Sequence, residues 1–309
     1  MNGIINVLKP SGMTSFDVVA HLRQVLGIRK IGHAGTLDPL AAGVLPVCIG
    51  RATKAIEFLI DKDKHYRAEL TLGVTTDTQD SSGKVLTMVI PDCSDEKIAT
   101  AVNSFAGKYL QLPPMYSALR VNGKRLYELA RDGIEIGRQH REVEVYSVQV
   151  QAIDRMEGIK VLFDVHCSKG TYIRTLCADI GKHLGCGGHM SFLLRKRAGS
   201  FDISEAYTLE ELYIRQKNGE FQAVLLGTDT IFYNIPDYTL DENSEKKFRN
   251  GMHIPVSVNL VPDDGSCQDS KNNKGDSFIR VYSATGEFIA LGTVKRSVDG
   301  TYLKAKKFF

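Results

Sequence analysis

One acidic residue, Asp38, stands inside a run rich in glycine and proline that extends from Gly32 to Pro46. Glycines allow the backbone to bend sharply and to approach a ligand closely. Pro39 fixes its own φ angle and favours an extended conformation at Asp38. Such a loop can hold one carboxylate at a defined angle, as catalysis by a carboxylate requires. The alternative is an ordinary Asp-Pro turn, which is the most common structure of that dipeptide.

Two further runs carry side chains suited to such a site. Tyr172 and Arg174 lie two residues apart in Ser168–Leu176, where an expected strand meets an expected helix. An arginine beside a buried carboxylate would keep it ionised and fix its orientation. Tyr66 could offer a flat face for stacking a nucleic-acid base. The alternatives are a helix-start arginine at the surface and an ordinary strand tyrosine.

Metal and cofactor chemistry find little support in the sequence. Asp77 and Asp80 could be read as metal ligands, but they lack a third ligand at suitable spacing, and a turn with the following Ser81-Ser82-Gly83 is favoured. The eight histidines show no zinc-binding spacing, and no phosphate-binding or dinucleotide-binding glycine motif occurs. We expect neither a metal nor a cofactor.

Charge is unevenly distributed. The net charge is only +3, but residues 1–60, 104–141 and 168–199 are basic, whereas 200–245 carries two basic residues against ten acidic ones. If the basic segments converge in space, they form a groove for a phosphate backbone. Separate solvated faces would explain the same counts.

The six cysteines are scattered without a C-x-x-C pair, which is typical of reduced thiols in a cytoplasmic protein. The first residues, MNGIINVLKPSG, do not resemble a signal peptide, because Lys9 and Pro10 interrupt the apolar stretch. No apolar run reaches the length that spans a membrane.

The hydrophobic pattern predicts an α+β fold, with a mixed, mainly antiparallel sheet flanked by helices. A helix should begin at Thr14 or Ser15, bury Phe16, Val19, Leu22 and Leu26 on one face, and end at Gly27. Other helices are expected over 52–60, from Ser94 to about residue 105, and over 171–183. Strands are expected over 3–8, 44–49, 66–72, 142–153, 159–167, 278–282, 288–294 and 302–304.

Two structural units are expected. Residues 1–240 would form the larger unit, with an insertion at about 108–141 that projects from the sheet, and 241–309 would form a small β-barrel. Within the barrel, the polar run 262–277 is predicted to be a flexible loop.

Six segments together resemble the TruB family of tRNA pseudouridine synthases, in the family's order and over most of residues 1–201. They are KPSGMTS (9–15), GHAGTLDPLAAGVLPV (32–47), KHYRAELTLGVTTDTQDSSG (64–83), PPMYSALRVNGKRLYELAR (113–131), CSKGTYIRTLCADIG (167–181) and GGHMSFLLRKRAGSF (187–201). Small departures are Arg120, where the family usually has lysine, and the run Leu194 to Arg197, which varies on Leu-Arg-Arg. The final barrel resembles the family's PUA-type RNA-binding domain more weakly.

The resemblance implies an isomerase that converts a uridine of tRNA, at position 55 in the T loop, into pseudouridine without a cofactor. Asp38 would be the catalytic carboxylate, Arg174 its ion-pair partner and Tyr66 the aromatic residue that stacks on the base. Other matching positions that line the pocket or bind substrate are Tyr172, Lys54, Leu194 and Lys9, and His33 matches a residue implicated in opening the loop. A monomer acting on the T-arm stem-loop in the cytoplasm is expected.

Three alternatives stay open at this point. A guide-RNA-dependent pseudouridine synthase would share the motifs, although the insertion at 108–141 favours the stand-alone bacterial type. An RNA chaperone that folds tRNA would not need the chemistry of Asp38. A metal-dependent hydrolase built on Asp77 and Asp80 would lose activity in a chelator.

Overall fold

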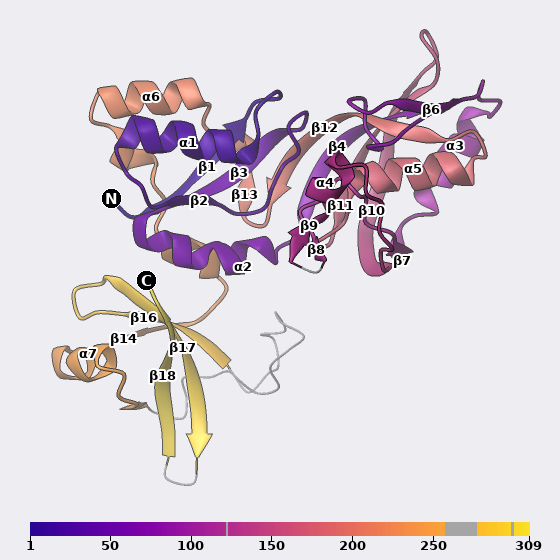
Figure 1. The fold of residues 1–309 in the computed structure, drawn as a ribbon. Coiled ribbons are helices and arrows are strands. Elements are labelled where there is room, and N and C mark those ends of the chain that lie inside the picture. Colours follow the sequence, from indigo (N-terminus) through magenta and orange to yellow (C-terminus); the bar gives the residue numbers. More distant parts are fainter. Residues whose placement is uncertain (122, 257–276, 298–299) are drawn as a thin grey trace.

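The computed structural model describes residues 1–121, 123–256, 277–297 and 300–309 (Figure 1). The flexible loop predicted over 262–277 lies outside these residues, apart from the first residue of one strand. The predicted α+β class is confirmed: a nine-stranded, mainly antiparallel sheet carries helices, and a second sheet of five strands lies at the C-terminal end.

The main sheet has the strand order β1-β3-β12-β4-β11-β10-β7, with β2 paired to β3 and β13 paired to β12. Its strands are β1 (Gly3–Lys9), β2 (Ile31–His33), β3 (Ala42–Ile49), β4 (Lys64–Leu72), β7 (Gly107–Gln111), β10 (Arg141–Asp154), β11 (Lys160–Cys167), β12 (Gly188–Ala198) and β13 (Phe201–Asp202). In β4, buried and partly exposed residues alternate, because one face packs on a core and the other meets water.

The sheet consists of two halves that meet at β3 and β12. These two strands pair in parallel, and only through Leu194 with Ala42 and Arg195 with Gly43. The other strand pairings of the main sheet are antiparallel throughout the described residues. The segment between β2 and β3, which contains Asp38, leaves the sheet beside this short junction.

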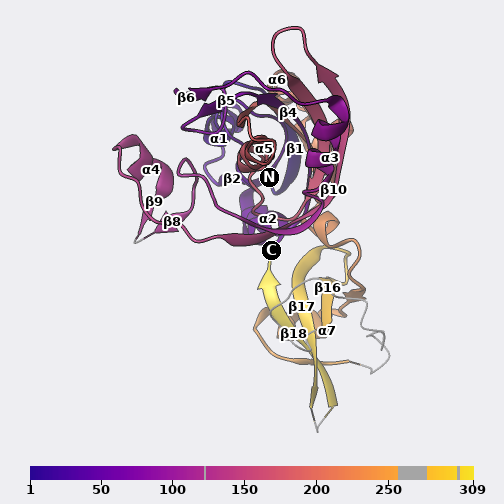
Figure 2. The same cartoon turned by 90° about the vertical axis from the view of Figure 1, so that its right-hand side faces the viewer.

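Helices cover the two halves separately (Figures 1 and 2). α1 (Ser15–Leu26) and α6 (Leu209–Lys217) bury apolar residues against β1 and β3, whereas α3 (Asp95–Asn103) and α5 (Ile173–His183) pack on β4, β11 and β12. α1 begins as predicted: Thr14 caps it in a capping box with Asp17, and Gly27 ends it in the left-handed conformation.

Shorter elements complete the chain. They are the 3₁₀ helices η1 (Gly50–Ala55), η2 (Ile203–Glu205), η3 (Phe221–Val224) and η4 (Thr228–Phe232), the helices α2 (Ile56–Ile60), α4 (Leu126–Arg131) and α7 (Glu242–Arg249), and the hairpins β5 (Val74–Thr76) with β6 (Val85–Met88) and β8 (Arg120–Val121) with β9 (Lys124–Arg125).

Two details of the prediction are wrong. Phe16, placed on the buried face of α1, is 62% exposed, while Val18 takes its place in the core. The first turn of a helix lies at the edge of what it packs against, so the 3.6-residue period alone misjudges the burial of a terminal residue. The single helix expected over 52–60 is a 3₁₀ helix followed by a short α-helix.

The inserted segment begins later than its predicted start, because β7 belongs to the main sheet and only 112–140 lie between β7 and β10. This segment contains the hairpin β8–β9 and α4. Figure 2 shows that they stand away from the sheet.

The five-stranded C-terminal sheet has the order β14-β16-β17-β18-β15, with strands Asp237–Thr239, Ser277–Tyr282, Phe288–Ser297, Gly300–Phe308 and Ile254–Pro255 respectively. It has a core of its own and also packs on the larger part through aromatic rings: Phe58 and Phe232 from the larger part meet Phe288 and Phe309. The strands predicted near 278–282, 288–294 and 302–304 are all confirmed. Among the described residues, no helix combines the length and the apolar composition needed to cross a bilayer.

We expect Phe163→Ala to lower the free energy of unfolding by about 3–5 kcal/mol, because this fully buried ring lies in the core beneath α5. The matched control is Phe16→Ala, which should cost less than about 1 kcal/mol, since the ring is exposed and the Arg23 guanidinium lies over it. Urea denaturation measures both. Equal losses would contradict the burial assigned to these two rings.

Candidate functional site

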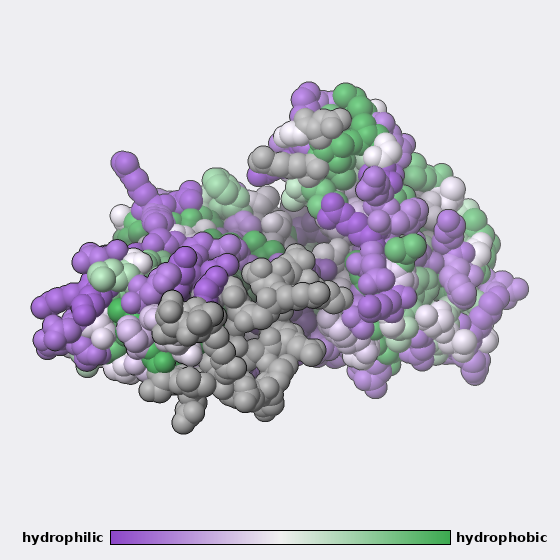
Figure 3. All heavy atoms as spheres, turned by 90° about the horizontal axis from the view of Figure 1, so that it is seen from below, coloured by the Kyte–Doolittle hydropathy of each residue, from purple (hydrophilic) through white to green (hydrophobic). Residues whose placement is uncertain are grey.

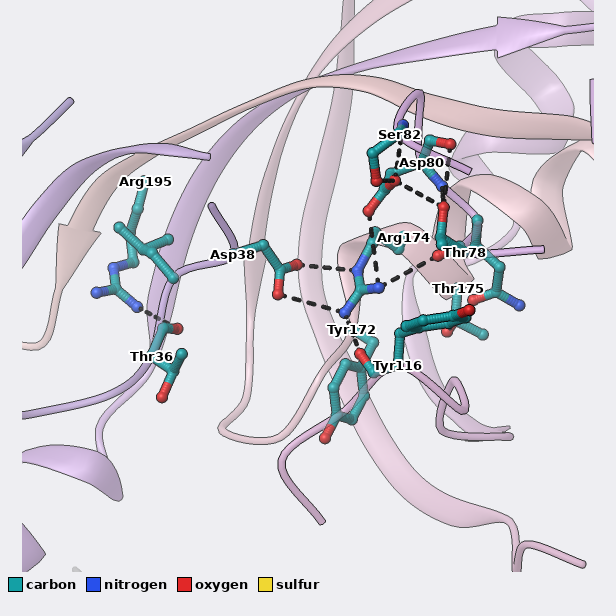
Figure 4. A network of polar contacts seen from close by, with 12 residues as sticks. Thr36, Asp38, Thr78, Asp80, Ser82, Tyr116, Tyr172, Arg174, Thr175 and Arg195 are labelled. Atoms are coloured by element: carbon teal, nitrogen blue, oxygen red, sulfur yellow. Dashed lines mark hydrogen bonds and ion pairs between the residues drawn. The ribbon is translucent and has the colours of Figure 1, made fainter. Parts of the chain in front are cut away.

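Asp38 lies in the loop between β2 and β3, and it opens a tight turn. The backbone N–H of Ala41 donates to the carbonyl of Asp38 at 3.1 Å, with Pro39 inside the turn. The Asp-Pro turn and the catalytic carboxylate were alternatives in the sequence, yet they are compatible here. The turn aims the carboxylate out of the loop, toward α5 (Figure 4).

The end of β1 and the start of α1 fix this loop through its backbone. Lys9 Nζ donates to the carbonyls of Pro10 (2.8 Å), Met13 (2.5 Å) and Pro39 (3.3 Å). Ser15 Oγ accepts from the N–H of Leu37 at 2.9 Å. Burial lowers the pKa of Lys9 to about 8, although the nearby Asp38 carboxylate opposes this effect. Lys9, predicted as a substrate-binding residue, therefore lies beside Asp38 and supports the loop.

Arg174 pairs with Asp38 through two nitrogen atoms on one edge of its guanidinium group. Its Nε lies 2.9 Å from Oδ2 and its Nη2 lies 3.3 Å from Oδ1. This is the two-pronged geometry in which a guanidinium fixes a carboxylate most firmly. The Arg174 side chain is 5% exposed, whereas the Asp38 side chain is 35% exposed. The arginine is thus the buried support, and the carboxylate is the member that a substrate can reach.

The remaining donors of Arg174 are also used. Nη2 donates to the carbonyl of Tyr116 (2.8 Å) in the inserted segment, and Nη1 donates to the carbonyl of Thr78 (3.2 Å) in the turn after β5. Nη1 also lies 3.7 Å from Asp80 Oδ2. Figure 4 shows these groups surrounding the guanidinium. A buried arginine needs such hydrogen-bond and ion-pair partners to be held in one orientation.

Asp80 is a member of the site that the sequence reading missed. Its buried carboxylate accepts from Thr78 Oγ1 (2.7 Å), the Ser82 N–H (3.0 Å) and Ser82 Oγ (2.5 Å) through one oxygen, and it faces Arg174 with the other. The predicted turn over 77–83 is present, and the turn is what fixes this carboxylate. The only signal in the sequence was the position of Asp80 within a motif of the resemblance.

Burial raises the pKa of Asp38 above the ordinary 3.8, and the charge of Asp80 raises it further. The positive charges of Arg174 and Lys9 and the hydrogen bond from Arg174 lower it in opposition. Because a third of the side chain remains exposed and both of its oxygens meet Arg174, the contacts with the guanidinium oppose this rise in pKa and favour the ionised carboxylate. Burial therefore makes Asp38 a stronger base than a surface aspartate, while the charge of Arg174 works against its protonation.

Two aromatic residues flank the carboxylate. Tyr66 lies on β4, on the face packed under α5, and the charge of Asp38 contributes to the raised pKa of its hydroxyl, for which burial is the main cause. Tyr172 precedes α5, and its backbone N–H and C=O bond to the side-chain amide of Gln111 at 2.8 and 3.0 Å. Gln111, at the end of β7, was also missed by the sequence reading.

The other predicted residues lie at different distances from this centre. His33 ends β2, and its buried Nδ1 has no hydrogen-bond partner among the described residues. Burial lowers the pKa of His33, and the charge of Arg195 adds to this effect. Leu194 lies on β12 at the junction with β3. Lys54 is not brought to Asp38: it lies in η1, and its Nζ donates to the carbonyl of Phe308 at 2.9 Å.

A cluster that the sequence did not suggest lies on the opposite face of β4. Asp63, His65 and His166 bring ligand-type atoms within 4.8 Å of one another. His166 Nε2 lies 2.5 Å from Asp63 Oδ2, the two imidazoles stack at 3.8 Å, and Arg197 Nη2 lies 2.6 Å from His65 Nε2. Because Arg197 occupies the lone pair that would bind a metal, the geometry is that of a hydrogen-bonded network.

Comparison with known proteins identifies the family. Residues 23–173 match the model of the TruB family pseudouridylate synthase N-terminal domain, and residues 174–232 match that of the tRNA pseudouridylate synthase B C-terminal domain. The chain belongs to the TruB family. It is a tRNA pseudouridine synthase, an isomerase that converts uridine in tRNA to pseudouridine.

Relatives called tRNA pseudouridine synthase B are similar over all or most of the chain. The protein of Clostridioides difficile (strain 630) is 45% identical over all of both chains, and that of Alkaliphilus oremlandii (strain OhILAs) is 51% identical over 82% of this chain and 83% of its own. Among solved structures, an H/ACA ribonucleoprotein bound to a substrate RNA containing 2′-deoxyuridine matches at 25% identity with a TM-score of 0.70, covering 99% of this chain and 84% of that one. The predicted family and fold are confirmed.

The pH dependence of the TruB reaction should reflect the ionisation of Asp38 in its pair with Arg174. We expect kcat/KM to fall on acidification at a pH above the ordinary aspartate value of 3.8, because protonation removes the charged carboxylate. Arg174→Gln should move this acid limb to higher pH, since loss of the positive charge favours the neutral acid. Initial rates across the acidic range measure the shift.

Arg67→Gln is the matched control for this experiment. Arg67 also forms a two-pronged pair with an aspartate, Asp164, at 2.7 and 2.8 Å, but on the other face of the sheet. Its loss should leave the acid limb in place. If both variants moved the limb equally, or if neither did, a group other than Asp38 would control the profile.

Proposed function

We propose that this TruB enzyme modifies uridine 55 in the T loop of tRNA, with Asp38 as the carboxylate that acts on the target nucleoside. The observation that carries the proposal is the Asp38–Arg174 pair, in which a buried arginine held by several hydrogen bonds presents a partly exposed carboxylate. Few arrangements of this kind serve stability alone, because a buried ion pair contributes little net free energy to folding.

The reaction breaks the bond between uracil N1 and ribose C1′, turns the base and rejoins it to the ribose through C5. Asp38 can attack C1′ or remove a ribose proton. Both routes require the ionised carboxylate, which the charge of Arg174 favours. Because the product is an isomer of the substrate, the atoms and electrons balance without an oxidant, a reductant or a transferred group.

The target base must leave its stack to reach Asp38. Flipping a nucleotide out of a folded loop costs a few kcal/mol, which stacking on an aromatic ring and contacts to phosphates can offset. We assign the stacking on the base to Tyr66, and the lining of the pocket to Tyr172, Leu194 and His33. Lys54 is bonded to the C-terminal sheet, so we assign it to the contact between the two parts of the protein.

We assign RNA binding to two parts of the protein outside the main sheet, the inserted segment and the C-terminal sheet. In the inserted segment, Arg125 and Arg131 lie over the ring of Tyr127, an arrangement of cations and an aromatic face suited to RNA. The C-terminal sheet exposes Lys304 and Lys306 on β18, and hydrophilic residues predominate on the surface in Figure 3. We therefore assign 1–240 to catalysis, with the insertion as an RNA grip, and 241–309 to RNA binding as a PUA-like unit.

The guide-RNA-dependent alternative rests on the likeness to H/ACA structures, one of which is described as a Cbf5–Nop10–Gar1 complex, at 26% identity. The stand-alone reading is favoured because relatives named for tRNA alone are 43–51% identical, including full-length matches. A monomer acting in the cytoplasm, where reduced cysteines and tRNA occur together, agrees with this reading.

We expect Asp38→Asn to abolish pseudouridine formation while changing the affinity for RNA by less than about tenfold, because the carboxylate serves chemistry more than grip. Tritium release from [5-³H]uridine at position 55 of a T-arm stem-loop measures turnover, and filter binding measures affinity. The same stem-loop with the label at another uridine is the control for position.

Retained turnover in Asp38→Asn would overturn the role of Asp38. Release from the other uridine but not from position 55 would overturn the proposed target. If neither protein released tritium and both bound tightly, the RNA-chaperone or guide-dependent reading would take precedence for this chain.

A second prediction concerns salt. Affinity for the stem-loop should fall by about tenfold or more between 50 and 200 mM salt, because phosphate contacts release counterions. Arg131→Ala should reduce the slope of log K against log [salt] by about 1. Arg155→Ala is the matched control, because Arg155 pairs with Asp95 away from the insertion and should not alter the slope. A flat response of the parent would contradict an electrostatic grip.

A further inference from the structure

Arg195 is a charged side chain with an unusual position. It lies on β12 at the short parallel junction, is 1% exposed, and is among the largest fully buried side chains of the described residues. Burial of a cation is costly unless its donors are satisfied. None of the described carboxylates forms a salt bridge with it. Its bonding partners therefore have to come from elsewhere in the fold.

Those partners are backbone carbonyls on both limbs of the Asp38 loop. On the limb that leads to Asp38, Nη2 donates to Gly35 (3.1 Å) and Nη1 to Thr36 (3.5 Å). On the limb that leaves Asp38, Nε donates to Val44 (2.7 Å). The planar guanidinium of Arg195 thus links the two limbs of the loop, which are otherwise separated by the apex that carries Asp38. Figure 4 shows Arg195 on the side of Asp38 that is opposite to Arg174.

The main chain of Arg195 approaches the same loop closely. A Cβ at Gly43 would lie 2.3 Å from the Arg195 carbonyl oxygen, and Gly43 has a φ of +117°, so no larger residue fits there without displacement. The loop is therefore clamped against β12 by the side chain and the backbone of one residue. Lys9 and Ser15 hold the loop from a different direction, since they come from β1 and α1.

The clamp also relates the loop to the predicted stacking residue. Arg195 is the register partner of Tyr66 across β12 and β4. The charge and hydrogen bonding of Arg195 act on the Tyr66 hydroxyl to lower its pKa, against the larger raising effect of burial. Arg195 thus contacts the loop that carries Asp38 and also lies beside Tyr66, the ring that would stack on the base.

We propose that Arg195 is a positioning residue for the isomerisation, which holds the Asp38 loop at a fixed distance from Tyr66 and Arg174. This inference rests on the proposed role of Asp38. Lysine could not substitute fully, because its donors all leave one nitrogen, whereas Arg195 reaches Val44 from Nε and reaches Gly35 and Thr36 from its two Nη atoms. A displacement of about 1 Å at a reacting group can reduce the rate by about a hundredfold.

The test compares Arg195→Met and Arg195→Lys with two controls. Val161→Ala removes a fully buried side chain on β11, where Val161 pairs with Leu70 of β4, and Arg197→Met removes an arginine two residues along β12 that faces Asp63 instead. Single-turnover tritium release at saturating RNA, the Kd for the stem-loop and the Tm are measured for each, with rates taken well below every Tm.

We expect Arg195→Met to slow the single-turnover rate by about a hundredfold, with Kd changed by less than about threefold, and Arg195→Lys to recover part of the rate. Val161→Ala should lower Tm but keep the parent rate, and Arg197→Met should keep the rate. The inference is overturned if Arg195→Met keeps the parent rate once folded, or if its loss of rate is matched by its loss of affinity.

If Arg195→Met does not fold, Arg195→Lys decides, because it keeps the charge: a rate within about twofold of the parent, at equal Kd, would overturn the inference, and a tenfold or greater loss at equal Kd would support it. Asp38→Asn is run in parallel. An active Asp38→Asn variant contradicts the proposed function itself, whereas an inactive one combined with a fully active Arg195 variant contradicts only the role of Arg195.

Discussion

The ion pair between Asp38 and Arg174 is the constraint around which the surrounding structure is organised. A carboxylate that meets substrate must remain partly exposed, but an arginine that orients it must be buried and fully bonded to stay in place. The turn after β5 supplies Asp80 and the Thr78 carbonyl, and the inserted segment supplies the Tyr116 carbonyl. Three segments distant in sequence therefore converge because one guanidinium has five donors to satisfy.

The Asp38 loop is held mainly through its backbone. Lys9, Ser15 and Arg195 all bond to main-chain groups, so the loop is fixed whatever its exposed side chains are. Gly43 also helps to fix the loop, because the absence of a side chain lets the backbone of Arg195 approach closely. This division explains why the motifs that resemble the family are short and separated: each contributes one or two groups to a common frame, and the strands between them need only suitable hydrophobic patterning.

The sequence predicted the elements well where the pattern is local. The capped helix that begins at Thr14 and the alternating strand β4 follow from spacing and capping residues alone. Asp38 and Arg174 could be named because each stands in a distinctive run. Asp80, Gln111 and Arg195 could not be assigned roles in this way, because their roles depend on which distant side chain or backbone group lies opposite them, and strand order is not encoded in periodicity. Lys54 illustrates the converse: the resemblance to the family suggested the pocket, but its amine bonds to the C-terminal sheet.

The charge balance of the site connects its chemistry with its substrate. Lys9, Arg174 and Arg195 stand against two carboxylates, Asp38 and Asp80, so the interior of the site carries an excess of positive charge even though the whole chain carries only +3. A surplus cation in a partly desolvated site acts more strongly than one at the surface, since the effective dielectric constant is lower. It favours the ionised form of Asp38 and the approach of a phosphate backbone. The same buried cations that organise the loop thus offset the negative charge of the two carboxylates beside it.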